Sequence, residues 1–318
     1  MLLELLPAGI AGFLAQMIDG ALGMGFGVTS ASLLLATSMA PAVVASTVKF
    51  AQLGTTLASG ASHWGVGNVD RGMMLRLAVP GGIGALVGAT VLSSLSLAAA
   101  APLMSALLLG LGVLVLLRFL LGGIPGPAVP GAADGGTPAS RRRGLLVPLG
   151  LVGGLVDSTG GGGWGPVVSS TLLSTGRTAP RRVIGSVAAA EFVVTVCASI
   201  GFVLGLGIGG VPVGLVLALM AGGVLAAPIA ARLAGRLPAP LLGILVGSLI
   251  ITLNLGPVLL TLGLPAPVRV GVQLGAAVIC LGLVARTIRM LRRRPRGLGD
   301  SPGETAAKPV AVPEPASS

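Results

Sequence analysis

Charged residues are scarce in this chain. Asp, Glu, Lys and Arg make up 9% of its 318 residues, whereas 53% are apolar; soluble domains carry about 25% charged residues. The mean hydropathy is +1.00, and several apolar runs reach the roughly 20 residues that a helix needs to span a bilayer. This composition excludes an ordinary soluble domain and predicts an all-α polytopic membrane protein.

Residues that bind metals or form disulfides are also scarce, and nucleotide-binding motifs are absent from the sequence. The two cysteines, Cys197 and Cys280, lie in separate apolar runs without CxxC spacing, so we expect them to be packing residues. His63 is the only histidine, which argues against a metal site. No glycine run is followed by Gly-Lys-Ser/Thr or lies in a soluble nucleotide-binding fold. We therefore predict no cofactor, no metal, no enzymatic activity and no use of ATP.

Basic residues exceed acidic ones, but they cluster beside the apolar segments. The formal net charge is +11, and arginines gather at 141–143, 177–182 and 286–296. This placement follows the positive-inside rule of membrane proteins, and it provides no basic, aromatic-interleaved face for nucleic acid. Residues 1–7 contain no basic residue, so we expect no cleaved signal peptide. The predicted surroundings are the lipid bilayer, and no nucleic-acid partner is expected.

A glycine-rich stretch occurs twice. Asp19–Gly27 reads DGALGMGFG, and Asp157–Gly165, 138 positions later, reads DSTGGGGWG. The copies align without a gap, and after a one-residue slip the match continues to Gln52 and Glu191. The chain is therefore predicted to be an internal duplication. An aspartate followed by several glycines should also interrupt a membrane helix, because both are unfavourable in its interior.

The arginine positions predict how the segments cross the membrane. With 286–296 in the cytoplasm, both ends of segment 144–175 face the cytoplasm, so this segment should enter the membrane and return, bending at its glycines. The corresponding segment 5–37 should enter from outside. Two re-entrant Gly-rich hairpins, each followed by three crossings, form an inverted-topology repeat of the kind found in secondary transporters. The alternative is that each of these segments forms one long tilted helix.

These assignments divide the chain into five parts. They are a first membrane repeat at 1–121, a cytoplasmic linker at 122–143, a second, inverted repeat at 144–263, an additional transmembrane helix at 264–291 and a disordered tail at 292–318. The arginines at the start of the tail place the C-terminus in the cytoplasm.

Both glycine-rich breaks are candidates for binding an anion. Where a half-helix begins at a break, its free N–H groups and the positive end of its dipole favour an anion. The residues predicted to bind substrate in this way are Gly23, Gly25, Gly27, Gly161, Gly163 and Gly165, with Ser30 and Ser169 adding hydroxyl groups. Asp19 and Asp157 are either caps that accept backbone hydrogen bonds or, together with Glu191, candidates for proton coupling.

A polar stripe follows the first break. Spacings of three or four positions place on one helix face the residues Ser46, Lys49, Gln52, Thr56, Ser59 and His63. A lysine this deep in an apolar segment needs an anionic partner. Two interpretations stay open: Lys49 pairs with Glu191 or Asp19 and only holds the repeats together, or Lys49, with Gln52 beside it, faces the central site and balances a substrate anion.

Each copy combines a Gly-rich break, a Ser- and Leu-containing run and a polar-striped helix. In these features the chain resembles the sulfite exporter TauE/SafE family of bacterial membrane permeases, over about residues 5–290. The resemblance implies a multi-pass protein of the bacterial inner membrane that transports sulfite or a small organosulfonate, in the export direction and coupled to protons. The alternatives are a passive anion channel and a membrane-embedded maturation factor or enzyme. The oligomeric state stays open.

Overall fold

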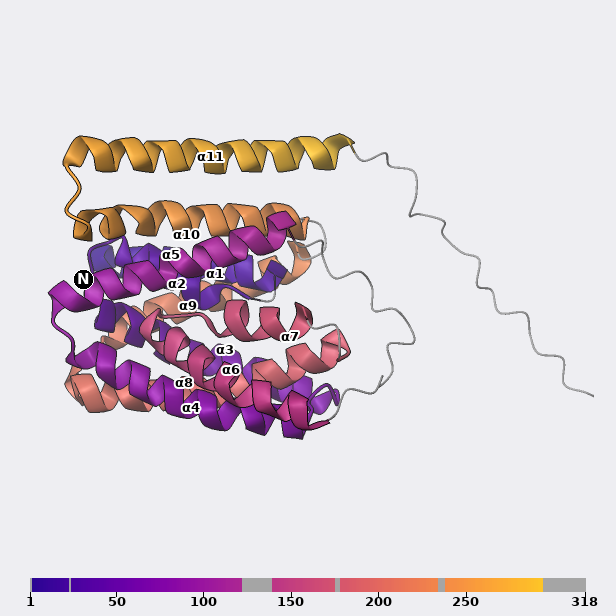
Figure 1. Ribbon diagram of the computed structural model, residues 1–318. Coiled ribbons are helices and arrows are strands. Elements are labelled where there is room, and N and C mark those ends of the chain that lie inside the picture. The colour runs from indigo at the N-terminus through magenta and orange to yellow at the C-terminus, as the bar shows by residue number, and fades with distance from the viewer. Residues whose placement is uncertain (1, 23, 122–138, 175–177, 234–237, 294–318) are drawn as a thin grey trace, which may run out of the picture.

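The computed structural model describes residues 2–22, 24–121, 139–174, 178–233 and 238–293. All regular elements in these ranges are helical (Figure 1), which agrees with the prediction of an all-α protein. The first half contains α1 (Leu2–Leu22), α2 (Phe26–Leu35), α3 (Pro41–Gly65), α4 (Arg71–Ser94) and α5 (Leu97–Leu121). The second half contains α6 (Ala139–Thr159), the π-helical turn η1 (Gly165–Ser169), α7 (Ser170–Ser174), α8 (Pro180–Leu206), the 3-10 turn η2 (Ile208–Gly210), α9 (Val213–Leu233), α10 (Ala239–Thr261) and α11 (Ala266–Arg293).

Five helices of the described part are long and apolar enough to cross a membrane. They are α4, α5, α8, α10 and α11. Helix α3 is also long enough, with 25 residues, but its polar stripe makes it less apolar. Its side chains Ser46, Lys49, Gln52 and Thr56 are buried, so the stripe faces the protein interior rather than lipid. The chain is a multi-pass membrane protein.

Both glycine-rich stretches interrupt the helix that contains them. Helix α1 ends at Leu22 and α2 begins at Phe26, while α6 ends at Thr159 and the helical turn η1 begins at Gly165. Two glycines, Gly25 with φ 126° and Gly161 with φ 71°, adopt backbone angles that other residues rarely tolerate. The alternative of one long tilted helix per segment is therefore wrong, because neither segment forms a continuous helix.

The two halves interlock through close helix contacts. Helix α1 of the first half packs on α9 of the second, and α6 of the second half packs on α4 of the first. A Cβ added at Gly12 would lie 2.0 Å from the Leu219 carbonyl oxygen, and one at Gly150 would lie 2.7 Å from that of Leu77. Glycine is needed at both positions, since only the smallest residue lets membrane helices approach this closely.

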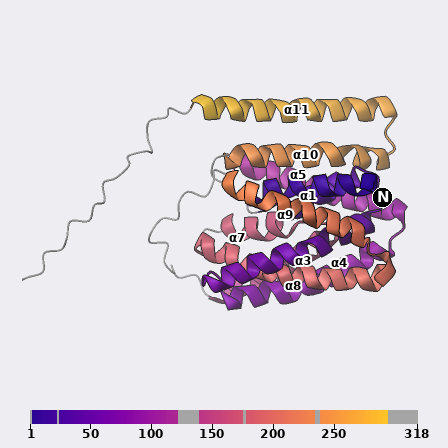
Figure 2. The same ribbon diagram turned by 180° about the vertical axis from the view of Figure 1, so that it is seen from behind.

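Helix α11 lies at the edge of the bundle, beside α10 (Figures 1 and 2). Many of its apolar side chains are exposed, including Val278, Ile279 and Leu281, as expected of a helix that faces lipid. Helix α6 begins at Ala139, so residues 139–143 of the predicted linker are helical. The rest of that linker, 122–138, and residues 294–318 of the predicted tail lie outside the described residues.

Candidate functional site

The two helix breaks meet in the centre of the bundle. A Cβ at Gly27 would lie 2.7 Å from the Cα of Gly162, and a Cβ at Gly162 would lie 2.3 Å from both the carbonyl carbon of Gly27 and the nitrogen of Val28. Real Cβ atoms do not approach other atoms this closely, so backbone packs directly on backbone here. Gly162 was not among the predicted residues. The run of four glycines at 160–163 was the signal for it.

A cavity of about 240 Å³ lies at this junction. Its volume is slightly below the roughly 300–1,000 Å³ typical of sites for drug-sized ligands, so it suits a small molecule. Its walls come from α1, α2, α3, α6, η1, α8 and the two breaks. The predicted residues that line it are Asp19, Gly25, Gly27, Gln52, Thr56, Ser59, His63, Asp157, Gly163, Gly165, Ser169 and Glu191.

Three of the residues predicted to bind substrate lie outside the cavity lining, and a fourth cannot be placed. Lys49 is fully buried beyond the cavity wall, and Ser30 is fully buried with no hydrogen-bond partner for its hydroxyl group within the described residues. Gly161 packs against Ala31 instead, where an added Cβ would lie 2.7 Å from the alanine Cβ. Gly23 lies outside the described residues.

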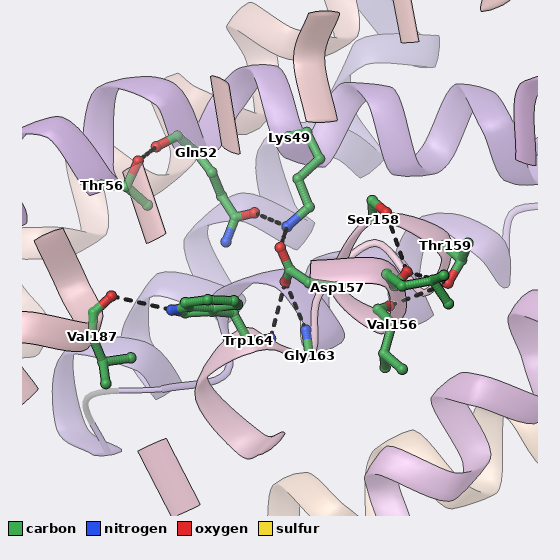
Figure 3. Close-up of polar contacts among 11 residues, drawn as sticks. Lys49, Gln52, Thr56, Val156, Asp157, Ser158, Thr159, Gly163, Trp164 and Val187 are labelled. Carbon is green, nitrogen blue, oxygen red and sulfur yellow. Dashed lines mark hydrogen bonds and ion pairs between the residues drawn. The ribbon is translucent and has the colours of Figure 1, made fainter. Parts of the chain in front are cut away.

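Both aspartates accept backbone hydrogen bonds across their breaks. One oxygen of Asp157, Oδ1, accepts from the N–H groups of Gly163 at 2.9 Å and Trp164 at 3.0 Å (Figure 3). The Oδ1 atom of Asp19 accepts from the N–H group of Phe26 at 3.2 Å. The capping role predicted for both residues is thus present, although each carboxylate reaches six or seven residues ahead instead of capping its own helix start.

Lys49 pairs with Asp157, whereas one of the two interpretations from the sequence paired it with Glu191 or Asp19. Its Nζ atom lies 2.6 Å from Oδ2 of Asp157, and both side chains are almost completely buried, with exposed fractions of 0% and 1% (Figure 3). The physical reason is the angle at which α3 passes the second break. The position of Lys49 on α3 directs its side chain toward the end of α6, where Asp157 lies. The correction joins α3 of the first half to the break of the second.

The ion pair also orients Gln52. The Lys49 ammonium group donates to Oε1 of Gln52 at 2.8 Å (Figure 3). An ammonium group has only donors to offer, so the amide oxygen must face Lys49 and the amide nitrogen must face away. Gln52 is 5% exposed and lines the cavity, and within the described residues its Nε2 atom has no hydrogen-bond acceptor. An oriented N–H donor therefore points toward the cavity.

Trp164 holds the second break against α8. The indole is completely buried, and its Nε1 atom donates to the carbonyl oxygen of Val187 at 3.1 Å (Figure 3). Glycine makes room for the ring: a Cβ at Gly81 would lie 2.8 Å from it, and one at Gly153 would lie 3.4 Å from it. Its counterpart in the first copy, Phe26, is also buried. The aromatic residue shared by both copies was the sequence signal for this contact.

The cavity lining is acidic. Asp19, Asp157 and Glu191 contribute carboxyl groups, and no lysine or arginine of the described part lines it. Arg118 of α5 contacts one lining residue, because its guanidinium group lies 3.4 Å from the sulfur of Met24, and it also donates to the hydroxyl of Ser170. Within the described residues, no cluster of three or more His, Cys, Asp and Glu side chains could hold a metal ion.

Comparison with known proteins identifies the family. Residues 8–256 match the protein family described as sulfite exporter TauE/SafE. A Bacillus subtilis (strain 168) protein named "Probable membrane transporter protein YtnM" is 45% identical over 251 residues, which cover 79% of this chain and 81% of that protein. No solved structure matches the chain. The chain therefore belongs to the sulfite exporter TauE/SafE family of membrane transporters.

Proposed function

We propose that this protein is a secondary transporter that carries a small anion, such as sulfite or an organosulfonate, through the cavity between the two helix breaks. Export is the direction that the family description names, and coupling to protons is part of the proposal. The observation that carries the proposal is the Gln52 amide. It is buried, fixed by Lys49 and presents its N–H donors to a cavity of small-molecule size.

Other groups of the cavity suit an anion as well. Helix α2 begins beside it, with Gly25 as its N-cap, and Asp19 accepts only the N–H group of Phe26, the first residue of the helix. Such a helix start favours negative charge. Ser59 and Ser169 add hydroxyl groups to the wall, and a hydroxyl can donate to an anion. Lys49 takes part indirectly, because its charge is already balanced by Asp157.

Removal of the Gln52 donors should weaken anion binding. We expect proteoliposomes containing the protein to take up labelled sulfite and labelled methanesulfonate in a saturable manner. Gln52→Leu should raise the half-saturating concentration about 10–100-fold, because a hydrogen bond to a charged group is worth about 1.5–3 kcal/mol. The matched control is Gln273→Leu, the same change in α11, away from the cavity.

Three outcomes of this measurement separate the candidate functions. Saturable flux that depends on Gln52 supports the transporter. Flux that rises linearly with concentration and does not saturate would indicate the passive channel. If neither anion crosses the membrane faster than in protein-free vesicles, the proposed function is wrong.

We also infer that the two halves have opposite orientations in the membrane. Support comes from the reciprocal packing of α1 on α9 and of α6 on α4. In Figure 1 the start of α1 lies at one end of the bundle, whereas α5 and α11 finish at the other. Basic residues begin α4 and α8 and occupy the last part of α11, as expected for a cytoplasmic end.

Equivalent positions of the two halves should be accessible from opposite sides. Ala40 and Ala179 are the N-caps of α3 and α8, and both are exposed. In a protein with Cys197 and Cys280 replaced by alanine, we expect Ala40→Cys to react with an impermeant maleimide from outside the cell. Ala179→Cys should react only after the cytoplasmic side is opened. Labelling of both cysteines from the same side would disprove the inverted arrangement.

A further inference from the structure

The two halves of the cavity differ at the position of Lys49. In the alignment of the two copies, Lys49 of α3 corresponds to Ala188 of α8, and Gln52 corresponds to Glu191. One half of the site therefore has a lysine and an amide, and the other half has an alanine and a carboxyl group. Ala188 and Glu191 both line the cavity, so this difference lies where a ligand would bind.

In the half of the site that contains Lys49, the lysine ammonium group binds the carboxylate oxygen of Asp157 that the backbone leaves free. Asp157 uses Oδ1 to accept the N–H groups at its break and Oδ2 to contact the Lys49 ammonium group. That ammonium group bridges Asp157 and Gln52. A positive charge is thus held between an aspartate at the break and the polar side chain one turn along the crossing helix.

The other half of the site has Ala188 in place of Lys49, so the corresponding aspartate, Asp19, has no lysine beside it. Oδ1 of Asp19 accepts the N–H group of Phe26, which is the counterpart of the bond from Trp164 to Asp157. Within the described residues, Oδ2 of Asp19 and the side chain of Glu191 make no hydrogen bond or ion pair, and Ala188 provides no charge. Two carboxyl groups thus face a cavity on the side where the other half holds an ammonium group.

We propose that an exchangeable cation, a proton or Na⁺, binds between Asp19 and Glu191, in the place that corresponds to the Lys49 ammonium group. This cation is the coupling ion of the transporter, so the inference rests on the proposed function. Lys49 is a permanent cation in one half of the site, and the coupling ion is its removable counterpart in the other half.

The other charges around this site leave it acidic without the ion. From α3 come Lys49, whose charge Asp157 of α6 balances, and His63 at the cavity wall. Arg71 of α4 stacks on Trp64, and Arg181 and Arg182 are exposed at the start of α8. On the side of α1, Arg118 of α5 contacts Ser170 and Met24. No described arginine or lysine lines the cavity to offset Asp19 and Glu191.

The coupling ion and the anion should therefore bind together. At a separation of about 5 Å and an effective dielectric constant of about 20, repulsion between two like charges weakens anion binding about 300-fold. A proton or Na⁺ bound between Asp19 and Glu191 cancels one negative charge there and so weakens that repulsion. Anion and cation then move in the same direction, and export proceeds whenever the outward gradient of the anion exceeds the inward gradient of the cation.

Gradient-driven flux of methanesulfonate tests this coupling. The methanesulfonate anion stays ionised across the pH range used, so it brings no proton of its own. Proteoliposomes are given either a pH gradient or a Na⁺ gradient, with equal methanesulfonate on both sides. We expect accumulation on the alkaline side if the ion is a proton, or on the low-Na⁺ side if it is Na⁺. The same assay is run with sulfite, and each variant is compared with the unmodified protein.

Two variants replace the exchangeable cation in different ways. Glu191→Gln makes one carboxyl permanently neutral and should reduce gradient-driven accumulation at least tenfold, while flux down the anion's own gradient continues. Ala188→Lys places a permanent ammonium group in the proposed site and should likewise uncouple flux from both gradients. Gln273→Leu, in α11 and away from the cavity, is the control for both variants and should remain coupled.

The outcomes distinguish this inference from the proposed function. If the protein carries either anion but neither gradient drives accumulation, or the anion moves opposite to the cation, only the inference is overturned. The inference is also overturned if Glu191→Gln and Ala188→Lys both fold and remain fully coupled. If neither anion is carried at all, the proposed function fails and the inference fails with it. Size-exclusion profiles in detergent establish that each variant is folded.

Discussion

Lys49→Met is expected to lower the free energy of unfolding by about 3–5 kcal/mol, the cost typical of breaking a buried ion pair by removing one partner. The Lys49 and Asp157 side chains are 0% and 1% exposed, so the substitution leaves a buried carboxylate without its cation. Methionine has a similar length and no charge, so lost packing adds little to the effect. Thermal unfolding of the purified protein in detergent measures the change.

The double variant Lys49→Met/Asp157→Asn tests whether the effect of Lys49→Met comes from the carboxylate left unpaired. Asparagine removes the unpaired charge but keeps an oxygen that can accept the N–H groups of Gly163 and Trp164. We expect the double variant to regain most of the lost stability yet to transport poorly, because the Gln52 amide is no longer oriented. Transport at the wild-type rate by the folded double variant would show that Lys49 only braces the structure. Unchanged stability of Lys49→Met alone would show that the ion pair contributes nothing.

Gly162→Ala is expected to abolish transport, with a loss of at least tenfold. The added Cβ would lie 2.3 Å from the carbonyl carbon of Gly27 and from the nitrogen of Val28, and these backbone atoms cannot rotate away as a side chain would. The two breaks must separate, which changes the cavity that lies between them. Overpacking of this kind costs about 1–3 kcal/mol, so the protein should still fold. Flux assays and thermal unfolding are measured on the same preparation.

Gly110→Ala is the matched control for this substitution. Gly110 lies inside α5, and a Cβ at this position would meet no atom within 4 Å. Alanine is preferred to glycine inside a helix by about 0.5–1 kcal/mol, so this variant should be as stable as the wild type or slightly more stable, with normal transport. Equal transport by Gly162→Ala and Gly110→Ala would contradict the close contact between the breaks.

The helices were predictable because each apolar run must satisfy its own backbone inside the membrane. Two of the apolar runs of the sequence, for example, form α4 (Arg71–Ser94) and α5 (Leu97–Leu121). The interruptions near Asp19 and Asp157 were predictable for a local reason too, since clustered glycines destabilise a helix whatever surrounds it. The orientation of the halves in the membrane stays a prediction, and so do the roles of the site residues.

The partner of Lys49 was not predictable in the same way. The sequence indicated that a buried lysine needs an anion, and the ion pairs predicted from it were with Glu191 or Asp19, not with Asp157. The choice depends on the direction in which α3 points Lys49 as it passes α6, to within the few ångströms that separate an ion pair from a solvated charge. Such an angle results from the packing of many side chains on several helices. Residue spacing along one helix carries no information about it.

By itself, the sequence determined that this protein is a helical membrane protein with two related, glycine-broken halves and a few buried charges. These properties depend on local composition and on the absence of water in the bilayer. Only the tertiary structure decided that Gly27 and Gly162 touch, that Asp157 binds Lys49, and that Asp19 and Glu191 face the cavity without a cation. Those contacts join residues from opposite halves of the chain, so they depend on how the helices pack together.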